Sequence, residues 1–261
     1  MQVSILSIVF MAVSAVISIG LPIALFIFIF KKYNAKFLPM IVGAAAFVIF
    51  ALVLEQAVHS VVLGNTAIAQ NTPLYILYGV FMAGIFEETA RFVSFKFLKK
   101  KYDGIETGLS YGIGHGGIEA VLLAGVAMIN NIVFSVAINS GNVEALTVNM
   151  SGDALANIGY VINEIVTMPP YVFLFSGIER VMAITVQIAL SVIVFYSVYS
   201  EGKLWLFPLA IVLHATVDVA AMLMQTGILK SVFAVEGIVL VCTVLVTIFA
   251  LYLHKKLKAS A

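Results

Sequence analysis

Long apolar runs separated by short polar segments dominate this sequence. Seven runs reach the roughly 20 residues that a helix needs to cross a bilayer. They span residues 3–30, 37–63, 73–95, 105–138, 180–199, 204–226 and 231–253. Each is too long for a transmembrane barrel strand of about 9–11 residues. The pattern therefore predicts an all-α fold, a polytopic transmembrane helix bundle of about seven spans.

The segment at residues 139–177 is the one sizeable stretch that we expect to lie outside the bilayer. It is rich in Asn, Ser and Gly, carries Pro169-Pro170, and has a mildly amphipathic part at residues 154–166. We predict an extracytoplasmic loop with a short interfacial helix. Because no internal repeat or linker interrupts the chain, we expect residues 1–261 to form a single integral membrane domain.

Composition supports a membrane protein and narrows its partners. Hydrophobic residues make up 62% of the chain and charged residues 10%, and the mean hydropathy is +1.13. Soluble domains are only about 45–50% apolar and about 25% charged. The lipid bilayer is thus the expected partner, and no basic patch is large enough to indicate nucleic acid. The single cysteine, Cys242, excludes an internal disulfide and a cysteine-based metal site.

Lysine positions predict the orientation, since cytoplasmic loops are rich in Lys and Arg. With seven spans, four lysine-bearing segments fall on one side. These are Lys31, Lys32 and Lys36; Lys96, Lys99, Lys100 and Lys101; Lys203; and Lys255, Lys256 and Lys258. The other side holds Arg180 and Lys230. We therefore expect a multi-pass protein of a bacterial-type plasma membrane, with the N-terminus outside and the C-terminus in the cytoplasm.

Ionisable residues interrupt four of the apolar runs, although each costs about 2.5–3.5 kcal/mol at the centre of a membrane helix on insertion scales. The third run contains Glu87-Glu88-x-x-Arg91. The others hold pairs spaced four residues apart, which share one helix face. These pairs are Glu55/His59, His115/Glu119 and His214/Asp218.

Depth connects three of these residues. Glu87, His115 and His214 each lie about nine or ten residues from the lysine-rich end of their span, or roughly 15 Å at 1.5 Å per residue. One carboxylate and two imidazoles at a common level favour hydrolysis. The carboxylate can take a proton from water, and the imidazoles can bind a metal ion or stabilise an oxyanion. Asp218 is placed to orient His214 or the water.

Structural roles are the alternatives for several of these groups. Glu87, Glu88 and Arg91 could form an ion-paired set near the cytoplasmic end, and each histidine could bond a backbone carbonyl. Glu119 is as well suited to a packing contact as to ligation. Glu55 and His59 lie deeper, where structural pairing is at least as reasonable as catalysis. For Glu179 and Arg180 an interfacial ion pair is the default.

Three motifs in order, Glu87-Glu88-x-x-Arg91, Tyr111-x-x-x-His115 and His214-x-x-x-Asp218, resemble the pattern of the CaaX protease and bacteriocin-processing superfamily and of the related PrsW proteases. In detail the chain most resembles the YhfC branch of intramembrane metalloproteases. Glu55, Glu119 and residues 177–180 also look like features of that branch. Two departures from the CaaX-type pattern are the two-residue gap before Arg91, where three are usual, and Tyr111 in place of Phe.

This resemblance implies a CaaX-protease-like core and assigns roles residue by residue. Glu87 would activate water, and Glu88 and Arg91 would support it. Asp218 would take the place of the Asn or Asp in the last motif. His115 and His214 would bind metal or stabilise the oxyanion. Zn²⁺ is the candidate cofactor, with ligands from the set Glu87, His115, Glu119 and His214, and a metal-free mechanism is the alternative. The altered spacing leaves both glutamates as candidates for the base.

The sequence therefore predicts an intramembrane peptidase with a cavity open to the cytoplasm. Its substrates would be membrane-embedded or lipidated peptides. A proton- or cation-coupled transporter that uses Glu55, His59 and Glu119 as a relay is the alternative function. A non-catalytic scaffold that keeps the family fold is a third possibility, which the intact set of buried charges disfavours.

Overall fold

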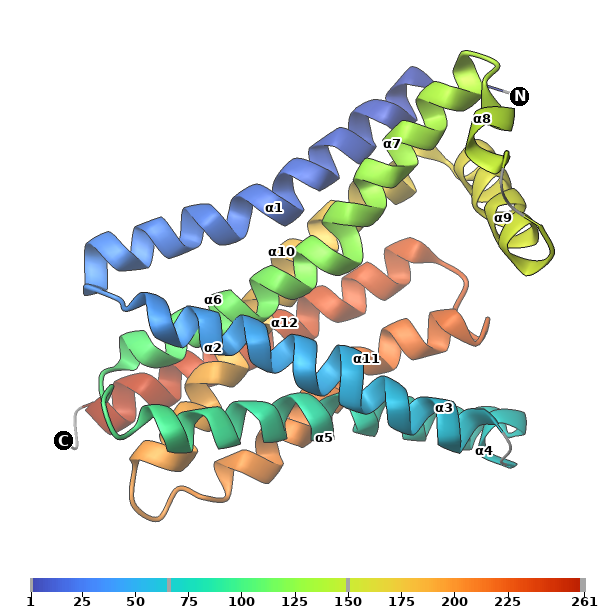
Figure 1. Cartoon of the computed structure of the whole chain (residues 1–261). Coiled ribbons are helices and arrows are strands. Elements are labelled where there is room, and N and C mark those ends of the chain that lie inside the picture. The colour runs from blue at the N-terminus through green and yellow to red at the C-terminus, as the bar shows by residue number, and fades with distance from the viewer. Residues whose placement is uncertain (1, 65–66, 149–150, 259–261) are drawn as a thin grey trace. The chain divides into compact units, whose positions relative to one another are not determined.

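The computed structural model describes residues 2–64, 67–148 and 151–258, and the regular elements within these ranges are helices (Figure 1). In chain order they are α1 (Ile5–Tyr33), α2 (Phe37–Phe47), η1 (Val48–Glu55), α3 (Gln56–Gly64), α4 (Ala67–Gln70), α5 (Thr72–Leu98), α6 (Ile105–Ala120), η2 (Val121–Gly125), α7 (Val126–Asn139), α8 (Val143–Thr147), α9 (Asp153–Thr167), α10 (Pro170–Tyr199), α11 (Leu206–Gln225) and α12 (Val232–Lys258). The elements η1 and η2 are π-helical. The predicted all-α class is confirmed.

Six helical segments within the described ranges are long and apolar enough to cross a membrane. They are α1, the continuous segments Phe37–Gly64 and Ile105–Asn139, α10, α11 and α12. Helix α5 is also long, with 27 residues, but its two glutamates, Arg91 and Lys96 make it less apolar. The helix begins at the N-cap Asn71, whose side chain accepts from the backbone N–H of Leu74 at 3.1 Å. The predicted number of about seven spans is therefore close to the number of long helices that the structure shows in the described ranges.

Helix α10 differs most from the expected spans. It begins at Pro170, ten residues before the predicted start at 180, because a proline at the first helical position has its backbone angle preset for a helix. Residues 170–177 are therefore helical rather than part of the loop, and Arg180 lies within the helix. The predicted short helix near 154–166 is observed as α9. Of the six apolar segments, α10 is the most buried. In an 18-residue apolar stretch of this helix 72% of the residues are buried, against at most 28% in the other segments.

The described residues group into two compact units. Unit 1 comprises Met1–Leu21 and Ala120–Val181, as far as they are described. Its core packs α9 residues Ile162 and Ile165 with apolar side chains of α1, α7 and α10. Unit 2 comprises Pro22–Glu119 and Met182–Ala261, again as far as described. Within unit 2, α5 lies alongside α11 and alongside the segment made by α2 and η1 (Figure 1).

Glycines let α6 approach its neighbours in unit 2 closely. A Cβ added at Gly114 would lie 1.9 Å from the carbonyl oxygen of Met40 in α2, and one at Gly43 would lie 2.2 Å from that of Tyr111. On the α10 side, a Cβ at Gly116 would meet the Cβ of Gln187 at 2.9 Å. These contacts permit no larger side chain without backbone movement. The glycine-rich start of the fourth run therefore brings α6 against both α2 and α10.

Candidate active site

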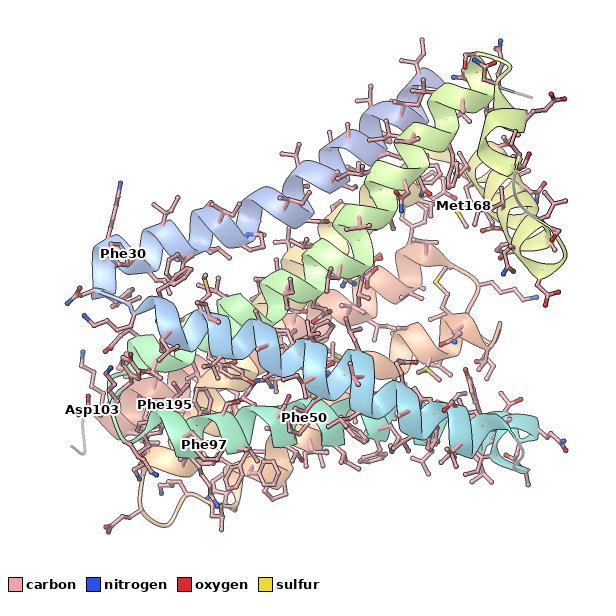
Figure 2. All side chains as sticks on the ribbon, in the orientation of Figure 1. Phe30, Phe50, Phe97, Asp103, Met168 and Phe195 are labelled. Carbon is pink, nitrogen blue, oxygen red and sulfur yellow. The ribbon has the colours of Figure 1, made fainter. Side chains whose placement is uncertain are left out.

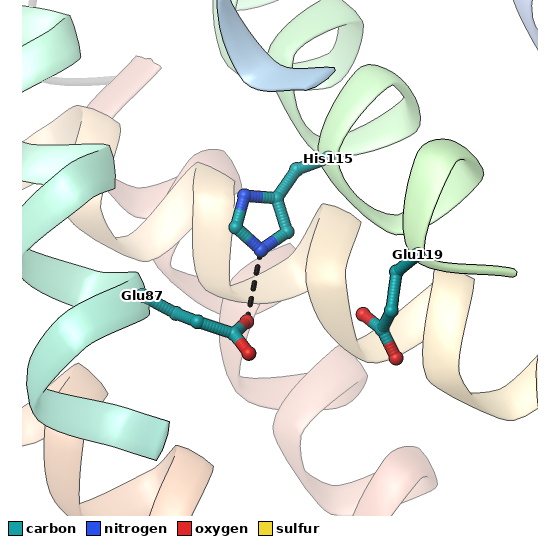
Figure 3. Close-up of side chains that lie close together, drawn as sticks. All are labelled: Glu87, His115 and Glu119. Carbon is teal, nitrogen blue, oxygen red and sulfur yellow. Dashed lines mark hydrogen bonds and ion pairs between the residues drawn. The ribbon is translucent and has the colours of Figure 1, made fainter. Parts of the chain in front are cut away.

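Glu87 on α5 and His115 on α6 form the centre of a buried group of polar side chains in unit 2 (Figure 3). His115 Nε2 lies 2.8 Å from Glu87 Oε2. Because a carboxylate only accepts, Nε2 is the donor in this contact. The side chain of His115 is fully buried and that of Glu87 is 10% exposed. The two residues that were expected at one depth are thus in direct contact.

Gln187 on α10 connects Glu87 to Glu119. Its Nε2 donates to Glu87 Oε2 and to Glu119 Oε2, each at 2.9 Å, and its Oε1 accepts from Arg91 Nη2. Since carboxylates only accept and guanidinium groups only donate, the amide cannot be flipped here. Every hydrogen of the amide nitrogen is used. Gln187 is 5% exposed, so these bonds form within the helix bundle.

Glu88 has different partners from its neighbour Glu87. Its Oε1 accepts from Arg91 Nη1 and lies 2.8 Å from His214 Nδ1 on α11. Glu88 and Arg91 are both fully buried. Because a carboxylate only accepts, the ring proton of neutral His214 lies on Nδ1. Its Nε2 then points toward Glu87 Oε2, 3.8 Å away. Glu88 therefore orients the ring and neutralises Arg91, whereas Glu87 faces both histidines.

Asp218 lies at the edge of this group. Its Oδ2 is 3.5 Å from His214 Nε2, and its side chain is 32% exposed. We call the following set the polar cluster: Glu87, Glu88, Arg91, His115, Glu119, Gln187, His214 and Asp218. It contains four carboxyl groups and a single guanidinium group. A second cation, or protonated histidine, would offset the remaining negative charge.

Glu55 and His59 form a separate chain of contacts with Tyr78. His59 Nε2 is 3.2 Å from Glu55 Oε1, and His59 Nδ1 is 2.9 Å from the hydroxyl of Tyr78. Glu55 is the last residue of the π-helix η1, and Glu119 lies two residues before η2. Short π-helical segments inside α-helices often occur at functional sites. The remaining pair, Glu179 and Arg180, bond each other in unit 1.

Three members of the polar cluster could hold a metal ion. Ligand atoms of Glu87, His115 and Glu119 all lie within 4.8 Å of one another, and Figure 3 shows the three side chains converging. Imidazole nitrogen and carboxylate oxygen are zinc donors, and catalytic zinc commonly has three protein ligands and one open position. The excess of carboxyl groups also favours a cation. In number, type and charge these residues fit a metal ion, and His214 lies outside this group of three.

Gln187 is the member of the cluster that the sequence reasoning missed. It stands in the middle of the apolar run MAITVQIALSVIV. A side-chain amide at that depth needs partners, because unbonded polar groups in hydrocarbon cost several kcal/mol. A glutamine within an apolar run is therefore a signal for a buried polar contact, even though the residue carries no charge.

The long apolar helices and the buried carboxylate–histidine centre define an integral membrane protein with a site suited to hydrolysis. The chain belongs to the YhfC intramembrane metalloprotease family, whose model matches residues 17–239 and so includes the whole polar cluster. It is 41% identical over 237 residues to "Uncharacterized membrane protein YhfC" of Bacillus subtilis (strain 168), covering 89% of this chain and 91% of that protein. No solved structure matches the chain.

Proposed function

We propose that this protein is an intramembrane peptidase that hydrolyses peptide bonds of membrane-associated or hydrophobic peptides. The observation that carries the proposal is the group of buried Glu87 and His115 with half-buried Glu119, which lies between membrane-type helices and has ligand atoms within 4.8 Å of one another. The family description, intramembrane metalloprotease, points to the same chemistry. It gives no support to a proton- or cation-coupled transporter.

Glu87 is the proposed base, and Zn²⁺ the proposed metal. A carboxylate has two oxygens, so one can bind an ion while the other accepts a proton from the attacking water. Glu119 and His115 complete the ligand set. A ligating imidazole nitrogen carries no proton, so binding the ion through Nε2 would replace the hydrogen bond that His115 donates to Glu87. A zinc ion bound there would polarise the scissile carbonyl and lower the pKa of bound water. The metal-free alternative keeps Glu87 as base and uses the histidines as oxyanion donors.

His214 is proposed to move the proton. With Nδ1–H donated to Glu88 at 2.8 Å, the neutral ring has a free lone pair on Nε2. That nitrogen lies 3.8 Å from Glu87 Oε2, so a small side-chain movement must shorten this distance before Nε2 receives the proton taken from water. Once protonated, Nε2 can donate it to the leaving amine. Arg91 and Glu88 are positioning residues in this scheme, because they act through His214 and Gln187.

Mapping new protein N-termini in membranes tests the proposal without a known substrate. Cells that express wild-type protein should accumulate cleaved membrane or secreted proteins that are missing when Glu87→Gln is expressed at the same level. Glu179→Gln is the matched control, since Glu179 pairs with Arg180 outside the polar cluster, and it should give the wild-type termini. Identical termini from wild type and Glu87→Gln would refute the proposed activity.

A further inference from the structure

Packed aromatic rings from three helices, which we call the aromatic layer, lie between the polar cluster and the helix ends that bear most of the lysines. Phe95 contacts Tyr111 at 4.9 Å between ring centroids and Phe195 at 5.9 Å, and Phe195 stacks on Tyr199 at 4.0 Å. Phe95 and Tyr111 are fully buried. Figure 2 shows Phe195 at the same end of unit 2 as Asp103, which lies in the lysine-bearing turn between α5 and α6.

The opposite end of α5 borders a cavity. This cavity of about 490 Å³ lies among α3, the first half of α5 and the second half of α11. Its polar lining residues are Glu55, Gln56, His59, Tyr75, Tyr78, Asp218 and Gln225. Tyr75 lies three residues after the start of α5, and Gln225 is the last residue of α11. The cavity therefore reaches the helix ends that are remote from the lysine-bearing segments at 96–101 and 203.

Asp218 connects the cavity to the polar cluster. It lines the cavity and its Oδ2 lies 3.5 Å from His214 Nε2, the nitrogen to which we assign proton transfer. Another cavity, of about 270 Å³, lies among α1, α6, α10 and α12, but its lining contains no member of the polar cluster. Of these two cavities, only the one beside Asp218 has a member of the polar cluster in its lining.

We infer that water and substrate reach the catalytic groups from the extracytoplasmic side, through the cavity beside Asp218. This inference rests on the proposed function for the meaning of the site and on the lysine distribution for its orientation. It reverses the sequence-based expectation of a cavity open to the cytoplasm. The aromatic layer then separates the site from the cytoplasm and keeps cytoplasmic peptides away from it.

The lining of the cavity also indicates what enters it. Carboxylates, phenol hydroxyls and side-chain amides offer hydrogen-bond partners along its walls. Apolar side chains, among them Leu63 and Met222, line the rest of the cavity, so an extended peptide would find partners there for both its backbone and its apolar side chains. An extended segment of a secreted or membrane-anchored protein that arrives from outside the cell fits such a cavity.

Cysteine labelling tests the route independently of catalysis. In a Cys242→Ala background, Ala83→Cys places a thiol in the cavity wall, and Lys100→Cys places one in the exposed turn after α5. We expect a membrane-impermeant cationic thiol reagent to label Ala83→Cys equally in intact and permeabilised cells. Lys100→Cys should be labelled only after permeabilisation. Ser94→Cys lies on the same helix but in the lysine-side half. It should not be labelled in intact cells, and after permeabilisation it should be labelled more slowly than Ala83→Cys.

Labelling of Ala83→Cys only after permeabilisation would overturn the inference. It would also be overturned if Ala83→Cys were labelled in neither preparation but reacted once the protein was denatured. Ala221→Cys, at another position in the cavity wall, repeats the measurement if Ala83→Cys does not accumulate. Glu87→Gln added to either variant should abolish cleavage and leave labelling unchanged, which separates the two proposals. If labelling follows the predicted pattern but the protein with Glu87 intact cleaves nothing, the peptidase activity is refuted and the route stands.

Discussion

Replacing Gln187 by Leu tests the network that surrounds Glu87. Leucine has a similar volume but removes three hydrogen bonds, to Arg91, Glu87 and Glu119. A hydrogen bond to a charged group contributes about 1.5–3 kcal/mol, and the three are not additive because they share one amide. Breaking a buried charged network costs about 3–5 kcal/mol, which is a large fraction of a typical unfolding free energy of about 5–15 kcal/mol.

The catalytic effect follows from the same bonds. If only one bond's contribution is lost at the transition state, kcat/KM should fall about 10- to 150-fold, since about 1.36 kcal/mol is a factor of ten. Unfolding midpoints in mixed detergent micelles and cleavage in proteoliposomes measure the two effects. Combining Gln187→Leu with Glu119→Gln should show a coupling of about 0.5–3 kcal/mol, as residues in one network do.

Ser191→Ala is the matched control for Gln187→Leu. Ser191 is buried on the same helix and donates to the backbone carbonyl of Gln187 at 2.7 Å, but touches no carboxylate of the cluster. Its loss should cost only about 0.5–1.5 kcal/mol and leave cleavage near the wild-type rate. Equal stabilities and equal cleavage rates for the two variants would refute a positioning role for Gln187.

Four further variants probe packing and charge. Gly114→Ala would set a Cβ 1.9 Å from the carbonyl oxygen of Met40 and should lower the unfolding free energy by about 1–3 kcal/mol. Gly237→Ala, with open space around its Cβ, should be neutral in the same micelle assay, and equal losses would contradict the packing argument. Arg91→Leu leaves Glu88 buried without its guanidinium partner and should cost about 3–5 kcal/mol. Arg91→Lys should recover part of that loss, and the two variants unfolding alike would exclude a role for the charge.

Much of the fold follows from hydropathy alone. Membrane helices must satisfy their backbone internally, so an apolar run of sufficient length predicts a helix with few alternatives. The start of α10 was missed because Pro169-Pro170 and Gly177 are typical of loops, although Pro170 in fact opens the helix. The π-helical turns before Glu55 and after Glu119 were also beyond prediction, because they depend on packing between helices rather than on local residue preferences.

Residue depth predicted part of the candidate site. Glu87 and His115 were expected at one level and are in contact at 2.8 Å, because rise per residue is fixed in a helix. Which glutamate faces the histidines depends on helix rotation, which depth does not give. The structure assigns Glu88 to Arg91 and His214 Nδ1. The position of the cavity could not be predicted either, because it depends on which side chains fill the space between helices.

Metal content and cleavage measured on the same purified protein test the central claim most directly. We predict that wild-type protein binds about one zinc ion per chain, as a three-ligand site does, that a chelator abolishes cleavage, and that zinc restores it. Glu119→Gln and His115→Ala should lose both the metal and the activity, whereas Ser191→Ala should keep both. Full cleavage by metal-free wild-type protein would contradict the metal-dependent mechanism built on Glu87, His115 and Glu119.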